Sequence, residues 1–162
     1  MHFRLVVQLL TLLALANVTP VIVNKVLGTR WSYPLDRGVK FVDDRPLFGS
    51  SKTIRGILSS VLVTALGAPL VGLEWKIGIA VGSLAMAGDL FSSFFKRRMR
   101  LPAGGRATGL DQIPESLFPL LACCHTLSLT ALDIALVVVV FFLGEVLLSL
   151  LFYKFHLRER PY

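Results

Sequence analysis

The segment IGIAVGSLAMAGDLFSSFFKRR, residues 77–98, decides how the chain folds. Between Ile77 and Phe95 it contains a single charged residue, Asp89, and three basic residues follow directly. A helix of about 20 apolar residues spans the hydrocarbon core of a bilayer, which is roughly 30 Å thick. The segment therefore predicts a membrane-spanning helix with one acid inside it and a basic end.

The composition of the whole chain also indicates a membrane protein. Hydrophobic residues make up 54% of the 162 residues, charged residues only 17%, and the mean hydropathy is +0.70. The 17 basic and 10 acidic residues leave a net charge of +7, which in a soluble protein would suggest nucleic-acid binding. The apolar residues form long blocks without an amphipathic period, so we expect an integral membrane protein with no nucleic-acid partner.

Four more apolar blocks of similar length occur along the chain. The first of them contains Asn17 and Pro20, which indicate a helix that is retained and locally broken. We predict an all-α polytopic protein with a single domain, residues 1–162. Its five transmembrane helices are expected at about 5–23, 56–73, 77–95, 113–132 and 134–153, and its two long loops at about 24–55 and 96–112.

The basic residues lie almost entirely on one side of this arrangement. All but two fall in the two long loops and the C-terminal tail; the exceptions are Arg4 and Lys76. Because cytoplasmic loops retain Lys and Arg, the N-terminus is expected outside and the C-terminus in the cytoplasm. The polar chemistry of both long loops should then face the cytoplasm from the inner membrane.

The first long loop has the composition of an anion-binding site. Gly49, Ser50 and Ser51 precede a Lys52-Thr53 pair, directly before a predicted helix. Backbone amides at a helix N-terminus, backed by basic side chains, suit a phosphate. The pattern is not a P-loop, because Ser51 and not glycine precedes Lys52. A helix cap with basic membrane anchors explains the same residues equally well.

Asp89 is the sharper signal, because an ionisable group inside a membrane helix usually marks a functional site. Ser92 or Ser93 and then Lys96 follow it at helical spacing, which places a carboxylate, a hydroxyl and an ammonium on one face. After a glycine-rich hinge, Asp111 enters the fourth predicted helix at the same boundary. In one interpretation both acids are structural, with Asp89 in an ion pair and Asp111 as a helix cap. The alternative is one Mg²⁺ held by both carboxylates and by substrate phosphates.

Together these patterns resemble the integral-membrane cytidylyltransferases that make CDP-activated lipids, and among them the short CDP-archaeol synthase family. The matching residues occur before or within the first four predicted helices. They are Ala16-Asn17 and Pro20-Val21; Gly49, Lys52-Thr53 and Arg55-Gly56; Gly88-Asp89, Ser93 and Lys96-Arg97-Arg98; and Asp111-Gln112.

The resemblance implies transfer of CMP from CTP to a lipid phosphate, with Mg²⁺ as cofactor. It assigns the metal to Asp89 and Asp111, and a catalytic role to both and to Lys96. Asp44 departs from the expected glycine, and the lipid stays open between an archaeal-type diether glycerol phosphate and a phosphatidic acid-like one. The residues that the resemblance assigns to nucleotide and phosphate are Asp43, Arg45, Lys52, Thr53, Arg55, Ser93, Arg97 and Arg98.

Two other functions stay open at this point. A small transporter would also have buried acids and broken helices, although the chain shows no internal repeat and its polar residues gather at one end. In a lipid-binding assembly factor without catalysis, Asp89 and Asp111 would be structural only. The partners expected for the enzyme are CTP, the lipid phosphate and membrane lipids, with a possible homodimer.

Overall fold

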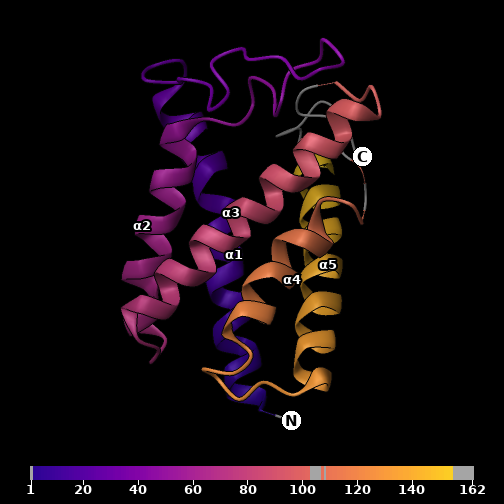
Figure 1. The fold of residues 1–162 in the computed structure, drawn as a ribbon. Coiled ribbons are helices and arrows are strands. Elements are labelled where there is room, and N and C mark those ends of the chain that lie inside the picture. The colour runs from indigo at the N-terminus through magenta and orange to yellow at the C-terminus, as the bar shows by residue number, and fades with distance from the viewer. Residues whose placement is uncertain (1, 103–106, 108, 155–162) are drawn as a thin grey trace.

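A computed structural model describes residues 2–102, 107 and 109–154, with only the backbone for 149–154. This part of the chain is helical and has no strand beyond two isolated bridges in one loop, which confirms the all-α prediction. The helices, shown in Figure 1, are α1 (Phe3–Leu27), α2 (Ile54–Leu70), α3 (Trp75–Arg98), α4 (Gln112–Cys123) and α5 (Ala131–Lys154).

Three of these helices are long and apolar enough to cross a membrane. They are α1, α3 and the segment Ala131–Leu148 of α5, whereas α2 is apolar but has only 17 residues. Large apolar side chains such as Leu58, Leu62 and Leu66 of α2 are exposed, as expected for a surface that faces lipid. The chain is therefore an integral membrane protein.

The prediction of a spanning helix over 113–132 is wrong in its length. Helix α4 has 12 residues, about 18 Å, and ends at Cys123. The next turn is closed by Ser128, which has a positive φ of 51°, and by a hydrogen bond from the Leu129 amide to the Cys124 carbonyl at 2.9 Å. This Schellman-type closure stops the helix in a stretch with little helix propensity.

Helix α1 runs through Pro20 without interruption, so the predicted local break is wrong. Proline has no N–H, which leaves the carbonyl four residues earlier, that of Ala16, without its helical donor. The hydroxyl of Ser60 in α2 donates to this carbonyl at 2.8 Å. The neighbouring helix thus supplies the missing hydrogen bond and keeps α1 continuous.

Helix α3 crosses the bundle obliquely and contacts α1, α2 and α4 (Figure 1). Its glycines allow this close approach: a Cβ on Gly78 would lie 2.3 Å from the Thr64 carbonyl oxygen of α2. Gly82 is equally close to Thr64, and Gly88 approaches α4. The four-residue spacing of Gly78 and Gly82 is typical of helix pairs in membranes.

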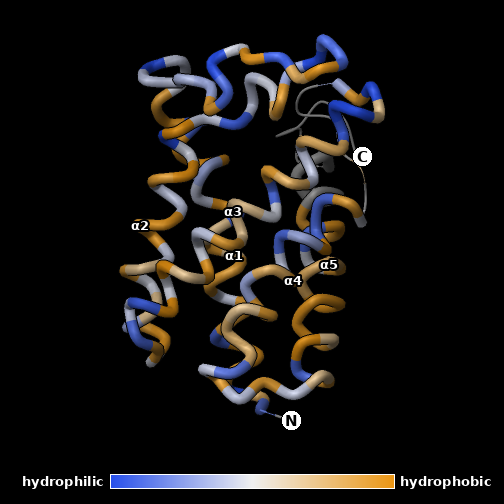
Figure 2. The backbone as a smooth tube through the Cα atoms, in the orientation of Figure 1, coloured by the Kyte–Doolittle hydropathy of each residue, from blue (hydrophilic) through white to orange (hydrophobic). Residues whose placement is uncertain are grey.

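Hydrophilic residues gather at one end of the bundle, as Figure 2 shows. This end carries the α1–α2 loop and the C-terminal end of α3, while the N-terminus lies at the other end (Figure 1). Both long loops thus begin at one end, as the charge distribution predicts. Which side of the membrane this end faces stays a prediction. Arg106, Arg158 and Arg160, three of the basic residues used for it, lie outside the described residues.

Candidate active site

An ion pair joins the α1–α2 loop to helix α3. The Lys52 ammonium donates to both carboxylate oxygens of Asp89, at 2.6 and 2.5 Å. Lys52 is held at this place because the next residue, Thr53, is the N-cap of α2 and its hydroxyl accepts from the Gly56 amide at 3.2 Å. Both members of the pair are about one-fifth exposed, so the pair borders the interior.

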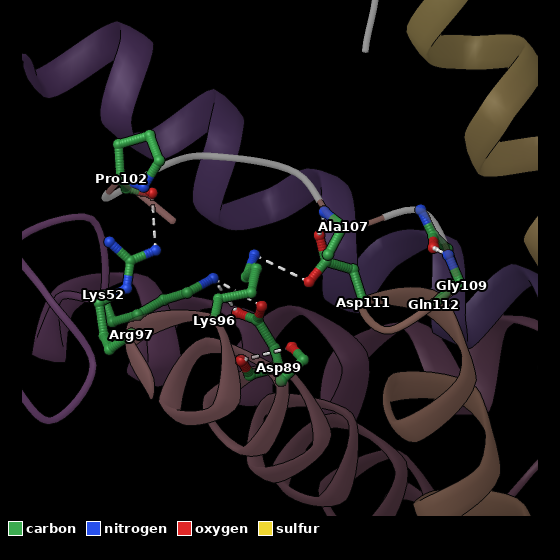
Figure 3. A network of polar contacts seen from close by, with 10 residues as sticks. Lys52, Asp89, Lys96, Arg97, Pro102, Ala107, Gly109, Asp111 and Gln112 are labelled. Atoms are coloured by element: carbon green, nitrogen blue, oxygen red, sulfur yellow. Dashed lines mark hydrogen bonds and ion pairs between the residues drawn. The ribbon is translucent and has the colours of Figure 1, made fainter. Parts of the chain in front are cut away.

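A second ion pair lies in the same polar network (Figure 3). The Lys96 ammonium, which is buried in the last turn of α3, lies 2.8 Å from Oδ1 of Asp111, directly before α4. Asp111 also accepts from the Ala107 amide at 3.3 Å. Ser93 is buried beside these residues, and Ser92 donates to the backbone carbonyl of Asp89 and not to its carboxylate. The two predicted metal ligands are therefore brought together, each with a lysine counterion.

Three separate sequence patterns meet in one cavity of about 210 Å³. Asn17 and Pro20 of α1 line one wall, Lys52 and Thr53 another, and Asp89 of α3 a third. The cavity thus contains a carboxylate, an ammonium and amide groups next to apolar side chains. Such a place suits the junction between a charged headgroup and a lipid tail.

A larger cavity of about 430 Å³, called the basic cavity below, lies under the α1–α2 loop and has three arginines and one acid, Asp36, in its lining. Arg45, Arg97 and Arg100 line it, together with Gly49 and Ser50. The Arg97 guanidinium is buried and donates to the carbonyl of Pro102 at 2.7 Å. Arginines beside a glycine-serine turn are suited to a phosphate chain.

Asp43, Arg45 and Arg98 fasten the loop to the end of α3. The Arg98 Nε lies 3.0 Å from a carboxylate oxygen of Asp43, and its guanidinium stacks over the rings of Phe41 and Phe94. Arg45 in turn donates to the carbonyl of Arg98 at 2.6 Å, at the C-terminal end of α3. These three residues thus hold the loop, part of which lines the basic cavity, against the end of α3. Contact with a nucleotide stays a prediction for each.

Arg55 contacts the end of α1 and not the two ion pairs. Its guanidinium donates to the side-chain oxygen of Asn24 at 2.9 Å, to the carbonyl of Gly28 at 3.0 Å and to the carbonyl of Arg30. A cation at the C-terminus of a helix neutralises the partial negative charge of the unpaired carbonyls. The structure thus gives Arg55 a structural contact, and its phosphate role stays a prediction.

Asp36 organises the loop and is absent from the sequence-based candidates. Its buried carboxylate accepts from the amides of Gly38, Phe48 and Gly49, the last at 2.8 Å. Burial alone would raise the pKa of Asp36, but these backbone hydrogen bonds outweigh it and lower that pKa below its ordinary value. The turn that lines the basic cavity thus forms around a buried anion. Its Asp-Arg-Gly sequence, typical of a turn, was the signal available.

Glu115 is a second polar residue that the sequence does not single out. It lies in the first turn of α4, is 4% exposed, and its Oε1 has no hydrogen-bond partner within the described residues. Asp89, Asp111 and Lys52 lie within electrostatic reach of it. An acid in the first turn of an apolar helix was the available signal.

Several known proteins similar to this chain share one family name. A family model described as CarS-like, CDP-archaeol synthase, matches residues 3–162. The CDP-archaeol synthase of Sulfurisphaera tokodaii is 34% identical over 135 residues, which is 80% of this chain and 81% of that protein. The CDP-archaeol synthase of Pyrococcus furiosus is 40% identical over 107 residues, 60% of each chain.

A solved structure is also similar over most of the chain. It is described as that of an intramembrane enzyme for archaeal membrane lipids biosynthesis, and it superposes with a TM-score of 0.75. The two chains are 29% identical, and the match covers 89% of this chain and 92% of the other. These findings favour the enzyme over a transporter or a non-catalytic assembly factor. The chain therefore belongs to the CDP-archaeol synthase family and is an integral membrane nucleotidyltransferase.

Proposed function

We propose that this protein transfers CMP from CTP to the phosphate of an archaeal-type diether lipid and releases pyrophosphate. The observation that carries the proposal is the convergence of Asn17, Pro20, Lys52 and Asp89 on one cavity at the polar end of a membrane bundle. The relatives named CDP-archaeol synthase favour the diether over phosphatidic acid.

The carboxylates present suit a magnesium ion. Mg²⁺ is usually held by one or two carboxylates together with phosphate oxygens and water. Asp89 and Asp111 supply two such carboxylates in one network. Among the described residues, no group of three or more acidic, His or Cys side chains could hold a metal unaided, so phosphates would complete the site. When bound, Mg²⁺ would neutralise charge that develops on the phosphate oxygens.

The basic residues would position and neutralise the two anionic substrates. An oxygen of the lipid phosphate forms a bond to the α-phosphorus of CTP, and the bond from that phosphorus to the leaving pyrophosphate oxygen breaks. Lys52 and Lys96 would contact the reacting phosphates, while Arg45, Arg97 and Arg98 would bind the triphosphate. No protein nucleophile is needed, because the lipid phosphate itself attacks.

The two cavities suit this division of the substrates. The cavity that contains Asp89 borders apolar side chains of α1 and α2. A lipid headgroup could enter it sideways from the membrane, between these helices. The basic cavity is lined by residues of the polar loop and by Arg97 and Arg100 at the end of α3. With the loops in the cytoplasm, as the charge distribution predicts, CTP would enter from that side.

The test is transfer of labelled CMP into lipid by the full chain purified in detergent with Mg²⁺ and CTP. An unsaturated archaeal-type diether glycerol phosphate and phosphatidic acid are compared as acceptors. We expect transfer to the diether and a loss of about 10²–10³-fold in Asp89→Asn, because the variant lacks one of the two carboxylates that would hold Mg²⁺ at the reacting phosphates. Lys40→Met, which changes an exposed lysine that pairs with the exposed Asp44, is the matched control and should keep full activity.

Two outcomes would contradict the proposal. Equal activity of folded Asp89→Asn would remove the acid from the reaction. Transfer to phosphatidic acid but not to the diether would keep the enzyme class and overturn the lipid.

A further inference from the structure

Both acids proposed to hold the metal already contact a lysine. The Lys52 ammonium bonds both oxygens of Asp89 and so lies on the edge of the carboxylate where a cation would bind. The Lys96 ammonium occupies Oδ1 of Asp111 at 2.8 Å. Each carboxylate is therefore neutralised in the protein without substrate.

A divalent cation that binds these carboxylates competes with the ammonium groups for the same negative charge. Mg²⁺ binds oxygen at about 2.0–2.1 Å, which would put it close to an ammonium that shares the same oxygen. Positive charges at such a separation repel strongly, most of all where protein excludes water. Lys52 is only about one-fifth exposed and Lys96 is buried, so solvent screens neither of them well.

A lysine displaced from its carboxylate is stabilised by another anion, because moving a partly buried charge out of an ion pair is costly. Lys52 follows Ser50 and Ser51 at the N-terminal end of α2, where backbone amides also favour an anion. Lys96 lies next to Arg97, which lines the basic cavity. A triphosphate in this region would give both ammonium groups new partners and leave the two carboxylates to the metal.

We propose that Lys52 and Lys96 hold the place of the metal, so that the divalent cation binds together with the nucleotide and not before it. This inference rests on the proposed function, which supplies CTP as the anion. The exchange moves each lysine from a carboxylate to a phosphate, and no covalent bond changes. The two lysines thus link metal binding to nucleotide binding.

The test measures binding of Mn²⁺, as a substitute for Mg²⁺, by equilibrium dialysis of the full chain in detergent. CTP is present in both chambers or in neither, and no lipid is added, so turnover does not occur. We expect the wild-type chain to bind Mn²⁺ at least about tenfold more tightly with CTP than without it. Equal Mn²⁺ affinity with and without CTP would overturn the inference.

Variants test whether the lysine causes this dependence. Without CTP, Lys52→Met should bind Mn²⁺ at least about tenfold more tightly than the wild-type chain, because the methionine keeps an apolar stem and removes the ammonium. Adding Asp89→Asn should abolish the gain, and Lys40→Met should behave as the wild-type chain. Lys96→Met repeats the test at the second pair, and gel filtration in detergent checks that each variant is folded.

The outcomes separate this inference from the proposed function. If a folded Lys52→Met or Lys96→Met shows no gain in Mn²⁺ affinity, the placeholder role of the lysines is overturned. This result would not contradict the proposed function, which is CMP transfer. If CTP fails to promote Mn²⁺ binding but Lys52→Met still gains it, the lysine blocks the metal and the nucleotide assignment is wrong. CMP transfer in the lipid assay, measured separately, decides the proposed function.

Discussion

Gly88 of α3 lies against the carbonyl of Pro114 of α4, so closely that a Cβ on Gly88 would be 2.3 Å from that oxygen. The contact lies one residue before Asp89 and three residues after Asp111. It therefore sets the separation of the two helices where each carries its acid. The distance between the acids depends on the missing side chain of one glycine.

Gly88→Ala should lower both stability and CMP transfer. The added methyl group meets backbone and not a flexible side chain, so α4 must move, at a cost of about 1–3 kcal/mol or more. The displacement of Asp111 should reduce transfer beyond the loss of folded protein, measured as activity per folded molecule. The matched control is Gly144→Ala in α5, where a Cβ would meet nothing within 4 Å. Equal behaviour of the two variants would contradict this role of the α3–α4 contact.

Arg55→Ala should act mainly on stability. Removing the guanidinium takes three hydrogen bonds from the end of α1, which we expect to cost about 1–3 kcal/mol and to lower the melting temperature in detergent. The KM for CTP should rise much less than in Lys52→Met. A large rise in KM with an unchanged melting temperature would show that Arg55 leaves α1 to bind phosphate.

Asp36 predicts a pH dependence of the loop. Because the folded state lowers the pKa of Asp36, its ionised form stabilises the fold above its unfolded pKa of about 3.9, and this contribution is lost as the pH falls through the lowered value. At pH 7, Asp36→Asn should weaken the loop by about 1–3 kcal/mol, seen as faster hydrogen exchange over residues 45–52. The difference between variant and wild-type chain should shrink below about pH 4. A difference that is constant over this range would contradict the assignment.

The predicted orientation can be tested with single cysteines. In a chain whose Cys123 and Cys124 are replaced by alanine, Val42→Cys places a thiol in the long loop, where Val42 is 95% exposed. Glu74→Cys places one in the exposed turn between α2 and α3. A membrane-impermeant maleimide should label position 74 in intact cells and position 42 only after the membrane is opened. The reverse pattern would invert the topology.

Much of the fold could be predicted because membrane helices depend on local composition. Blocks of apolar residues predict α1, α2, α3 and α5 within a few residues, since lipid requires each segment to satisfy its own backbone hydrogen bonds. The end of α4 could not be predicted in this way. Apolar residues continue beyond Cys123, and hydropathy does not detect the closure at Ser128.

The sequence by itself determined the class of the protein and the residue types of its site: apolar spans, the intramembrane acid Asp89, a Lys52-Thr53 pair and a later aspartate, a combination that resembles one enzyme family. Only the tertiary structure decided the partners. It joins Lys52 to Asp89 and Lys96 to Asp111, and it turns Arg55 toward α1. The reason is physical: hydropathy and capping act over a few residues, whereas these contacts depend on how closely α3 packs against α2 and α4.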